Sequence, residues 1–296
     1  MKPAPFEYFS PDDVEEITAL LAQYGFDCRI IAGGQSLVPL LNMRMMSPAV
    51  LISINHCPVL AGIEDNDGKV VIGAAARQIA VWRSEIVKRR CGLLTQTIPH
   101  VGTRSNQNRG TVCGSLAHND PLAELPAAAL ALEAQFVLTS TAGSRTVDAG
   151  DFFVSELATS CEPEEFLEKI IVPTDPHGAG AAFAEIGVRA HGFAVAGMAA
   201  RVTLDDEGRF ASVRLAGMGF AGCAIRFTSV EDALIGEYPG DAAYAAAASA
   251  AEEMADPVAD IHATAEYRTK AAGFLTKRVL RDAAEDCGRA REFAHD

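Results

Sequence analysis

The chain has 296 residues, a length that suggests about two domains. Hydrophobic residues make up 49% and charged residues 22%, which excludes a disordered tail, a collagen-like fibre and a charge-rich coiled coil. The net charge of −14, from 25 Lys and Arg against 39 Asp and Glu, argues against nucleic-acid binding, because phosphate backbones are held by clustered basic residues. No run approaches the roughly 18 apolar residues of a membrane span, and the N-terminal residues do not read as a secretory signal.

The seven cysteines are odd in number and are never spaced as C-x-x-C. This pattern argues against a disulfide framework and a structural zinc site. It predicts free thiols in a reducing cytoplasm, and no metal or iron–sulfur ligand set in this chain.

The first third of the chain predicts a βαβ-like unit. A helix begins with Ser10 as N-cap and Pro11 at its first position, and Gly25 ends it. The apolar runs and the helical pattern that follow predict two buried strands joined by a helical segment, namely strand 29–32, helix 37–41 and strand 50–54.

The next hundred residues mix helices and strands. We expect strand 69–73, helix 79–89, a polar surface or functional loop from His100 to Thr111, helix 121–132, and strand 134–140 paired with residues 145–147. Prolines and a glycine cluster in Val172–Gly178, which predicts a domain boundary at residue 176. Beyond it we expect strands 194–204 and 212–218 in a hairpin with the turn Asp205–Gly208, and helices 241–255 and 265–284.

The strongest local motif is Ile31-Ala32-Gly33-Gly34-Gln35-Ser36-Leu37, where an apolar strand ends in two glycines before a helical pattern. Glycines let the backbone approach a ligand closely, and free N–H groups at the following helix start can hold a diphosphate, with Ser36 as a further donor. The motif is neither a Walker A loop nor G-x-G-x-x-G, so a Rossmann fold is not supported. The alternative is a plain strand-to-helix turn.

A second motif, Asn108–Pro121, again combines glycines, small hydroxyl residues and an acid. Asp120 or Glu124 could accept hydrogen bonds from a ribose or an adenine. Asp120 could equally be only the N-cap of a helix that starts at Pro121. For His118 we expect a structural role. Neither motif contains a nucleophile with its base, and the chain therefore reads as the holder of a large anionic cofactor.

The two motifs together, Ala32–Arg44 and Asn108–Pro126, resemble the FAD-binding medium subunit of molybdenum hydroxylases, and the resemblance covers nearly the whole chain. This family includes carbon monoxide, nicotine and quinoline dehydrogenases and is related to xanthine dehydrogenase. The resemblance implies an α+β fold. A vanillyl-alcohol-oxidase-type FAD-binding domain, residues 1–176, would consist of two α/β subdomains, about 1–56 and 57–176. A C-terminal α+β domain with an antiparallel sheet would span 177–296.

The resemblance also implies a set of FAD-binding residues and no catalytic or metal-binding residue. The first loop would cradle the diphosphate, the second would form the other FAD loop, Asp120 or Glu124 would meet the ribose or adenine side, and Leu167 would line the flavin pocket. The full set is Ile31, Ala32, Gly33, Gly34, Gln35, Ser36, Leu37, Val101, Thr111, Val112, Cys113, Gly114, Ser115, Asp120, Glu124 and Leu167.

Three positions depart from the family pattern. Cys113 replaces the first glycine of T-I-G-G, so a displaced loop is expected. Gln107 replaces the first arginine of R-N-R-G-T. Gly192 stands where an aspartate is usual, which questions a polar contact of that strand with the flavin edge.

The implied function is electron transfer in a cytoplasmic heterotrimer, assembled as a dimer of heterotrimers. A large subunit would carry the molybdenum cofactor and a small subunit two 2Fe–2S clusters, and FAD in this chain would pass electrons to an external acceptor. The substrate could be an N-heterocycle such as nicotine, an aldehyde or CO. The alternatives are a self-contained FAD-dependent oxidoreductase and a non-catalytic flavin-binding module.

Overall fold

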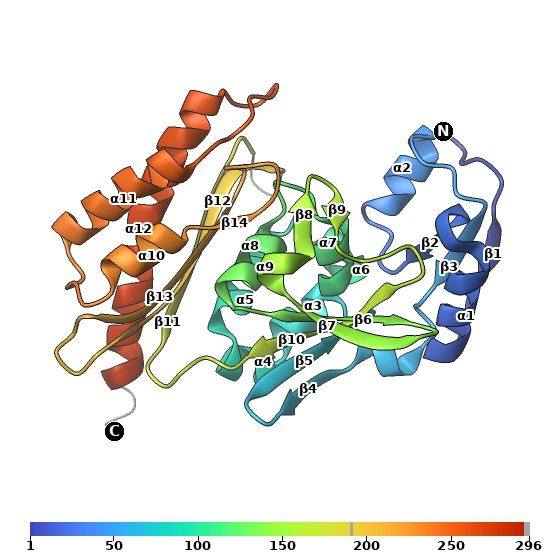
Figure 1. Cartoon of the computed structure of the whole chain (residues 1–296), viewed down its shortest axis with the longest axis horizontal. Helices are drawn as coiled ribbons and strands as arrows, with labels where there is room; N and C mark the ends of the chain where they lie inside the picture. The colour runs from blue at the N-terminus through green and yellow to red at the C-terminus, as the bar shows by residue number, and fades with distance from the viewer. Residues whose placement is uncertain (190–191, 293–296) are drawn as a thin grey trace.

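The computed structural model describes residues 1–189 and 192–292, with the three larger sheets in a row along the long axis of the molecule (Figure 1). A small parallel sheet at the N-terminal end is followed by a central antiparallel sheet and then by a C-terminal antiparallel sheet covered by long helices. This arrangement confirms the predicted α+β class with an antiparallel C-terminal sheet.

The N-terminal unit confirms the predicted βαβ arrangement. Its sheet has the order β1-β3-β2, and both neighbouring pairs are parallel. The elements are β1 (Glu7–Phe9), α1 (Val14–Tyr24), η1 (Gly25–Asp27), β2 (Cys28–Ile31), α2 (Leu37–Met43) and β3 (Val50–Ser53).

The predicted start of the first helix is wrong by one turn. The N-cap is Asp13, whose carboxylate accepts a hydrogen bond from the Glu16 N–H at 2.7 Å. Ser10 is instead paired through its hydroxyl with His56 at 2.6 Å. Gly25 ends the helix at φ +48°, as predicted, because glycine adopts the left-handed region without steric cost.

The central sheet has the strand order β4-β5-β10-β6-β7 and is antiparallel throughout. It confirms strand 69–73 and the pairing of strand 134–140 with residues 145–147. Its strands are β4 (Ile63–Asn66), β5 (Lys69–Gly73), β6 (Gln135–Ser140), β7 (Gly143–Asp148) and β10 (Phe166–Pro173), with η2 (Pro58–Ala61), α9 (Ala149–Phe152), β8 (Phe153–Ser155) and β9 (Ala158–Thr159) beside them.

The helices that cover the central sheet correct three predictions. The helix expected over 79–89 is two helices, because Ser84 adopts extended backbone and caps the second one. The loop expected from His100 to Thr111 holds a helix with a Thr103/Asn106 capping box. The helix expected from Pro121 starts at Glu124. The helices are α3 (Gln78–Arg83), α4 (Glu85–Arg90), α5 (Gly92–Thr97), η3 (Ile98–His100), α6 (Arg104–Arg109), α7 (Val112–His118) and α8 (Glu124–Ala131).

The C-terminal sheet has the order β11-β12-β13-β14 and confirms the predicted hairpin, with Gly208 of its turn at φ +82°. The strand β11 was missed, because its alanine-rich sequence gives no alternation. The elements are β11 (Gly180–Gly187), β12 (Ala194–Leu204), β13 (Phe210–Met218), β14 (Ile225–Arg226), α10 (Thr228–Leu234), α11 (Asp241–Met254) and α12 (Ala265–Glu292). The two long helices confirm the predictions for 241–255 and 265–284.

The two faces of β11 serve different cores. Ala181 and Phe183 pack with the core of the central sheet, whereas Ala182 and Ala184 pack with the core under α11 and α12. Successive side chains of a strand point to opposite faces. The C-terminal sheet is therefore sandwiched between its own helices and the helices α5 and α8 of the preceding unit.

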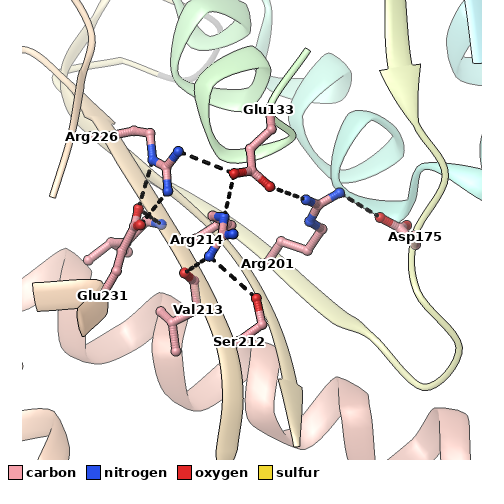
Figure 2. Close-up of polar contacts among 9 residues, drawn as sticks. Glu133, Asp175, Arg201, Ser212, Val213, Arg214, Arg226 and Glu231 are labelled. Atoms are coloured by element: carbon pink, nitrogen blue, oxygen red, sulfur yellow. Dashed lines mark hydrogen bonds and ion pairs between the residues drawn. The ribbon is translucent and has the colours of Figure 1, made fainter. Parts of the chain in front are cut away.

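An ion cluster around Glu133 joins the first 176 residues to the C-terminal sheet (Figure 2). Glu133 follows α8 with φ +53°, and its carboxylate lies 3.3 Å from Arg201, 2.8 Å from Arg214 and 3.4 Å from Arg226. Asp175 and Glu231 extend the cluster to Arg201 and Arg226. Three carboxylates thus balance three guanidinium groups, so the cluster acts as a neutral link and offers no surplus charge to an anion.

Within the described residues, none of the helices has the length and apolar character needed to cross a membrane. The domain boundary at residue 176 stays a prediction.

Candidate functional site

The first glycine loop lies at the carboxyl edge of the parallel sheet. Strands β2 and β3 run in the same direction, so the residues that follow them, Gly33-Gly34 and Asn55, meet at one edge. The Asn55 amide donates hydrogen bonds to the Ala32 carbonyl at 2.9 Å and to the Ile31 carbonyl at 3.4 Å. Asn55 therefore fixes the backbone of the loop.

The two glycine loops, which are about eighty residues apart in sequence, are in direct contact. A Cβ added to Gly33 would lie 2.4 Å from the Arg109 carbonyl oxygen and 2.6 Å from the Gly110 Cα. A Cβ added to Gly114 would lie 3.9 Å from the Ala32 Cβ. Gly33 is thus required by contact between the loops, while Gly34, at φ +73°, is required by its own backbone conformation.

Polar side chains that sequence reasoning missed hold these loops together. Arg77 donates to the Asn55 side chain and to the Arg109 carbonyl, both at 2.6 Å. Asn106 donates to the Gln35 side-chain oxygen at 3.1 Å. The Gln35 amide nitrogen in turn donates to the Gly33 carbonyl at 3.1 Å. A polar residue directly after a buried strand was the available signal for Asn55, but no sequence pattern points to Arg77.

The second loop is the N-terminal turn of α7. The Thr111 hydroxyl accepts a hydrogen bond from the Gly114 N–H at 3.0 Å and caps the helix. Val112 and Cys113 are buried, and the Cys113 thiol donates to the Ile72 carbonyl at 3.6 Å. Burial raises the pKa of this thiol to about 12, so Cys113 is an inert core residue. Gly114 and Ser115 are half-buried on the accessible side.

These loops fit the diphosphate of a dinucleotide. Glycines without Cβ atoms meet at their junction, and Gln35 and the Ser36 hydroxyl, which makes no capping bond, are exposed there. Arg77 donates to the Arg109 carbonyl, so two basic residues lie beside the loops, and burial together with the charge of Arg109 lowers the pKa of Arg77. Positive charge beside exposed backbone suits an anion.

The other expected site residues flank the loops or lie elsewhere in the fold. Ile31 and Leu37 flank the first loop and are half-buried, as is Val101, whose carbonyl accepts from Gln107 at 3.1 Å. Leu167 is buried in β10. Asp120 is not the N-cap of α8: its carboxylate accepts from the Leu122 N–H at 2.8 Å, and Ala123, which makes no side-chain cap, holds the N-cap position.

Glu124 is buried at the first position of α8, with 7% of its surface exposed. Desolvation raises its pKa to about 8, and the nearby Glu185 and Asp120 carboxylates add to the effect. Glu124 thus carries a proton at neutral pH. Direct contact of any of these residues with a cofactor stays a prediction.

Both halves of the chain match sequence models of known protein families. Residues 4–175 match the model of the FAD binding domain in molybdopterin dehydrogenase, and residues 181–283 match the CO dehydrogenase flavoprotein C-terminal domain. The chain belongs to the FAD-binding medium subunits of molybdenum hydroxylases.

Two subunits of bacterial dehydrogenases are similar to this chain over nearly their full length. The alpha subunit of the 6-hydroxypseudooxynicotine dehydrogenase complex of Paenarthrobacter nicotinovorans is 40% identical over 95% of both chains. The carbon monoxide dehydrogenase medium chain of Hydrogenophaga pseudoflava is 36% identical over 97% of this chain and 100% of its own.

Solved structures agree with the assignment. The structure of carbon monoxide dehydrogenase from Hydrogenophaga pseudoflava matches with a TM-score of 0.95 at 37% identity, covering 97% of this chain and 100% of that one. Quinoline 2-oxidoreductase from Pseudomonas putida 86 matches with a TM-score of 0.92 at 32% identity, covering 97% and 99%. This medium subunit therefore has the family fold over nearly all of its described residues.

Two departures from the family pattern have local roles. The Gln107 side chain is buried and donates to the Ile98 carbonyl at 3.1 Å as well as to Val101, so it holds the segment before α6. Gly192 is exposed, and its N–H donates to the Arg189 carbonyl at 3.1 Å. Ala190 and His191 of the same stretch lie outside the described residues.

Replacing Cys113 by glycine is expected to lower stability and to leave FAD content unchanged. The thiol packs in the core and does not face the loop, so its removal costs packing and adds a helical glycine, about 2 kcal/mol together. Urea unfolding and the flavin-to-protein ratio would measure both effects. Cys113→Ala, which keeps the helix propensity, is the control and is expected to lose less. Complete loss of flavin in the glycine variant would place Cys113 at the cofactor.

Proposed function

We propose that this medium subunit is the electron-transfer subunit of a heterotrimeric molybdenum hydroxylase. Its FAD receives electrons from two 2Fe–2S clusters in a small subunit and passes them to an external acceptor, while a large subunit carries the molybdenum cofactor and the substrate site. The observation that carries the proposal is the contact between the Gly33-Gly34 loop and the Arg109–Gly114 segment, which brings the two glycine-rich loops together in one surface.

The similar proteins support this role and its setting. The relatives at 40% and 36% identity are a subunit of a dehydrogenase complex and the medium chain of another enzyme. The two enzymes are named for different substrates, 6-hydroxypseudooxynicotine and carbon monoxide, although both of these subunits are similar to this chain. We therefore place substrate choice in the large subunit, where an N-heterocycle, an aldehyde or CO could be used. We further propose a dimer of heterotrimers; the cytoplasmic location stays a prediction.

Substrate is expected to reduce this flavin only when the partner subunits are present. The purified chain loaded with FAD should keep its oxidised absorbance when mixed anaerobically with the substrate of the complex, while dithionite should bleach it. Adding the iron–sulfur and molybdenum subunits should restore bleaching by substrate.

Two outcomes would contradict the proposal. Rapid bleaching of the isolated chain by substrate would favour the self-contained flavoenzyme. Chromatography of the flavin released by denaturation tests the cofactor itself, and FMN in place of FAD would overturn the assignment of the two loops.

A further inference from the structure

Arg77 lies at the point where the two glycine-rich loops meet. Its backbone pairs with Thr111 in an isolated antiparallel bridge, and the Gln78 N–H donates to the Gly110 carbonyl beside it at 2.9 Å. Gln78 is the first residue of α3, and Thr111 caps α7, whose first turn is the second loop. The backbone of Arg77 is therefore fixed against the second loop by hydrogen bonds that do not involve its side chain.

The guanidinium group of Arg77 joins the two loops through neutral acceptors. It donates through Nη1 to the Arg109 carbonyl and through Nη2 to the Asn55 Oδ1, both at 2.6 Å. The Asn55 Nδ2 in turn donates to the Ala32 carbonyl and to the Ser53 hydroxyl oxygen, both at 2.9 Å. Asparagine suits this position because a single amide group accepts from the guanidinium and donates to the loop.

The positive charge of Arg77 has no acidic partner. Within the described part of the chain, neither Arg77 nor its neighbour Arg109 forms an ion pair with an Asp or Glu. In a chain with 39 acidic and 25 basic residues, two unpaired arginines side by side stand out, because a partly buried charge without a counter-charge costs free energy. An anion on the loops would supply the missing negative charge.

We propose that Arg77 is a positioning residue whose charge sets the affinity of the loop junction for a diphosphate, acting through the Arg109 carbonyl and Asn55. Hydrogen bonds that start from a charged donor and continue through an amide polarise one another, so one guanidinium strengthens the donors of both loops while it holds them together. This inference rests on the proposed function, because the diphosphate is that of the FAD assigned to this chain.

Arg77→Gln and Arg77→Lys separate the charge from the hydrogen bonds. Glutamine keeps a donor and loses the charge, whereas lysine keeps the charge and loses the planar fork. In FAD titrations of the full chain freed of flavin, Arg77→Gln should bind on the order of thirtyfold more weakly than the wild type, as for loss of a charged hydrogen-bond donor, and Arg77→Lys should lie between them. Binding to the wild type should also weaken more steeply with rising salt, because salt screens the charge.

Arg83→Gln is the matched control, because Arg83 is exposed at the other end of α3 and its loss changes the net charge equally. The control should bind FAD like the wild type, and circular dichroism should show the same fold in all four proteins. Equal FAD affinity in Arg77→Gln and Arg83→Gln would overturn the proposal. Weaker binding in Arg77→Lys than in Arg77→Gln would also overturn it, since hydrogen-bond geometry alone would then decide.

Inorganic pyrophosphate is the second probe, and it separates failure of this inference from failure of the proposed function. Calorimetric titration should show pyrophosphate binding to the wild type and weaker binding to Arg77→Gln. A wild type that binds pyrophosphate in this Arg77-dependent way but does not bind FAD would contradict the proposed function and support the role of Arg77. A wild type that binds FAD with the affinity of Arg77→Gln would do the reverse.

Discussion

Replacing Gly33 by valine is expected to abolish FAD retention while the remainder of the chain stays folded. The new Cβ would lie 2.4 Å from the Arg109 carbonyl oxygen and 2.6 Å from the Gly110 Cα, and both are backbone atoms that cannot rotate away. Overpacking of this kind costs about 1–3 kcal/mol, and each 1.4 kcal/mol lost from binding is about tenfold in affinity. The valine would separate the two loops that form the proposed diphosphate site.

The measurement is the flavin absorbance per mole of protein, with circular dichroism to check folding. Gly150→Val is the matched control, because Gly150 is exposed and an added Cβ there meets nothing within 4 Å. The control is expected to retain flavin. Normal flavin content in Gly33→Val would show that contact between the loops is not needed for cofactor binding.

The stability of the wild type is expected to fall with rising pH relative to that of Glu124→Gln. The pKa of Glu124 is about 8 in the folded chain, against an ordinary value of 4.5. Between these pH values the folded state holds a proton that the unfolded state lacks, so unfolding releases it. The free energy of unfolding therefore decreases as the pH rises, by up to about 1.4 kcal/mol per pH unit.

Glutamine has the shape of the protonated acid and does not titrate, so the difference between the two proteins isolates this one group. Between pH 5.5 and 7.5 the wild type should lose about 2.5 kcal/mol relative to Glu124→Gln. Urea unfolding at several pH values measures the difference, with Glu253→Gln as the exposed control. Parallel pH profiles for wild type and Glu124→Gln would show that Glu124 is ionised in the folded chain.

The glycine-rich loops and most regular elements could be predicted from the sequence. The Gly33-Gly34 motif follows an apolar strand, and the hairpin of β12 and β13 is marked by its Asp-Asp-Glu-Gly turn, so local patterns suffice. Predictions of helix boundaries failed where several neighbouring residues can act as the N-cap. Asp13 replaced Ser10 as a cap, Ser84 split one helix in two, and the polar stretch before Thr111 became helical through a capping box. Several adjacent residues could cap in each case, and packing selects among them.

The sequence by itself determined the two glycine-rich loops and the family pattern, because both consist of contiguous residues. Only the tertiary structure decided that Gly33 contacts Arg109, that Arg77 and Asn55 hold the loops together, and that Glu133 meets three arginines from another sheet. It also decided the protonation of Glu124, which the sequence shows only as an acid near a helix start. The pKa of a carboxyl group depends on burial and on charges brought close by folding, and neither can be read along the chain.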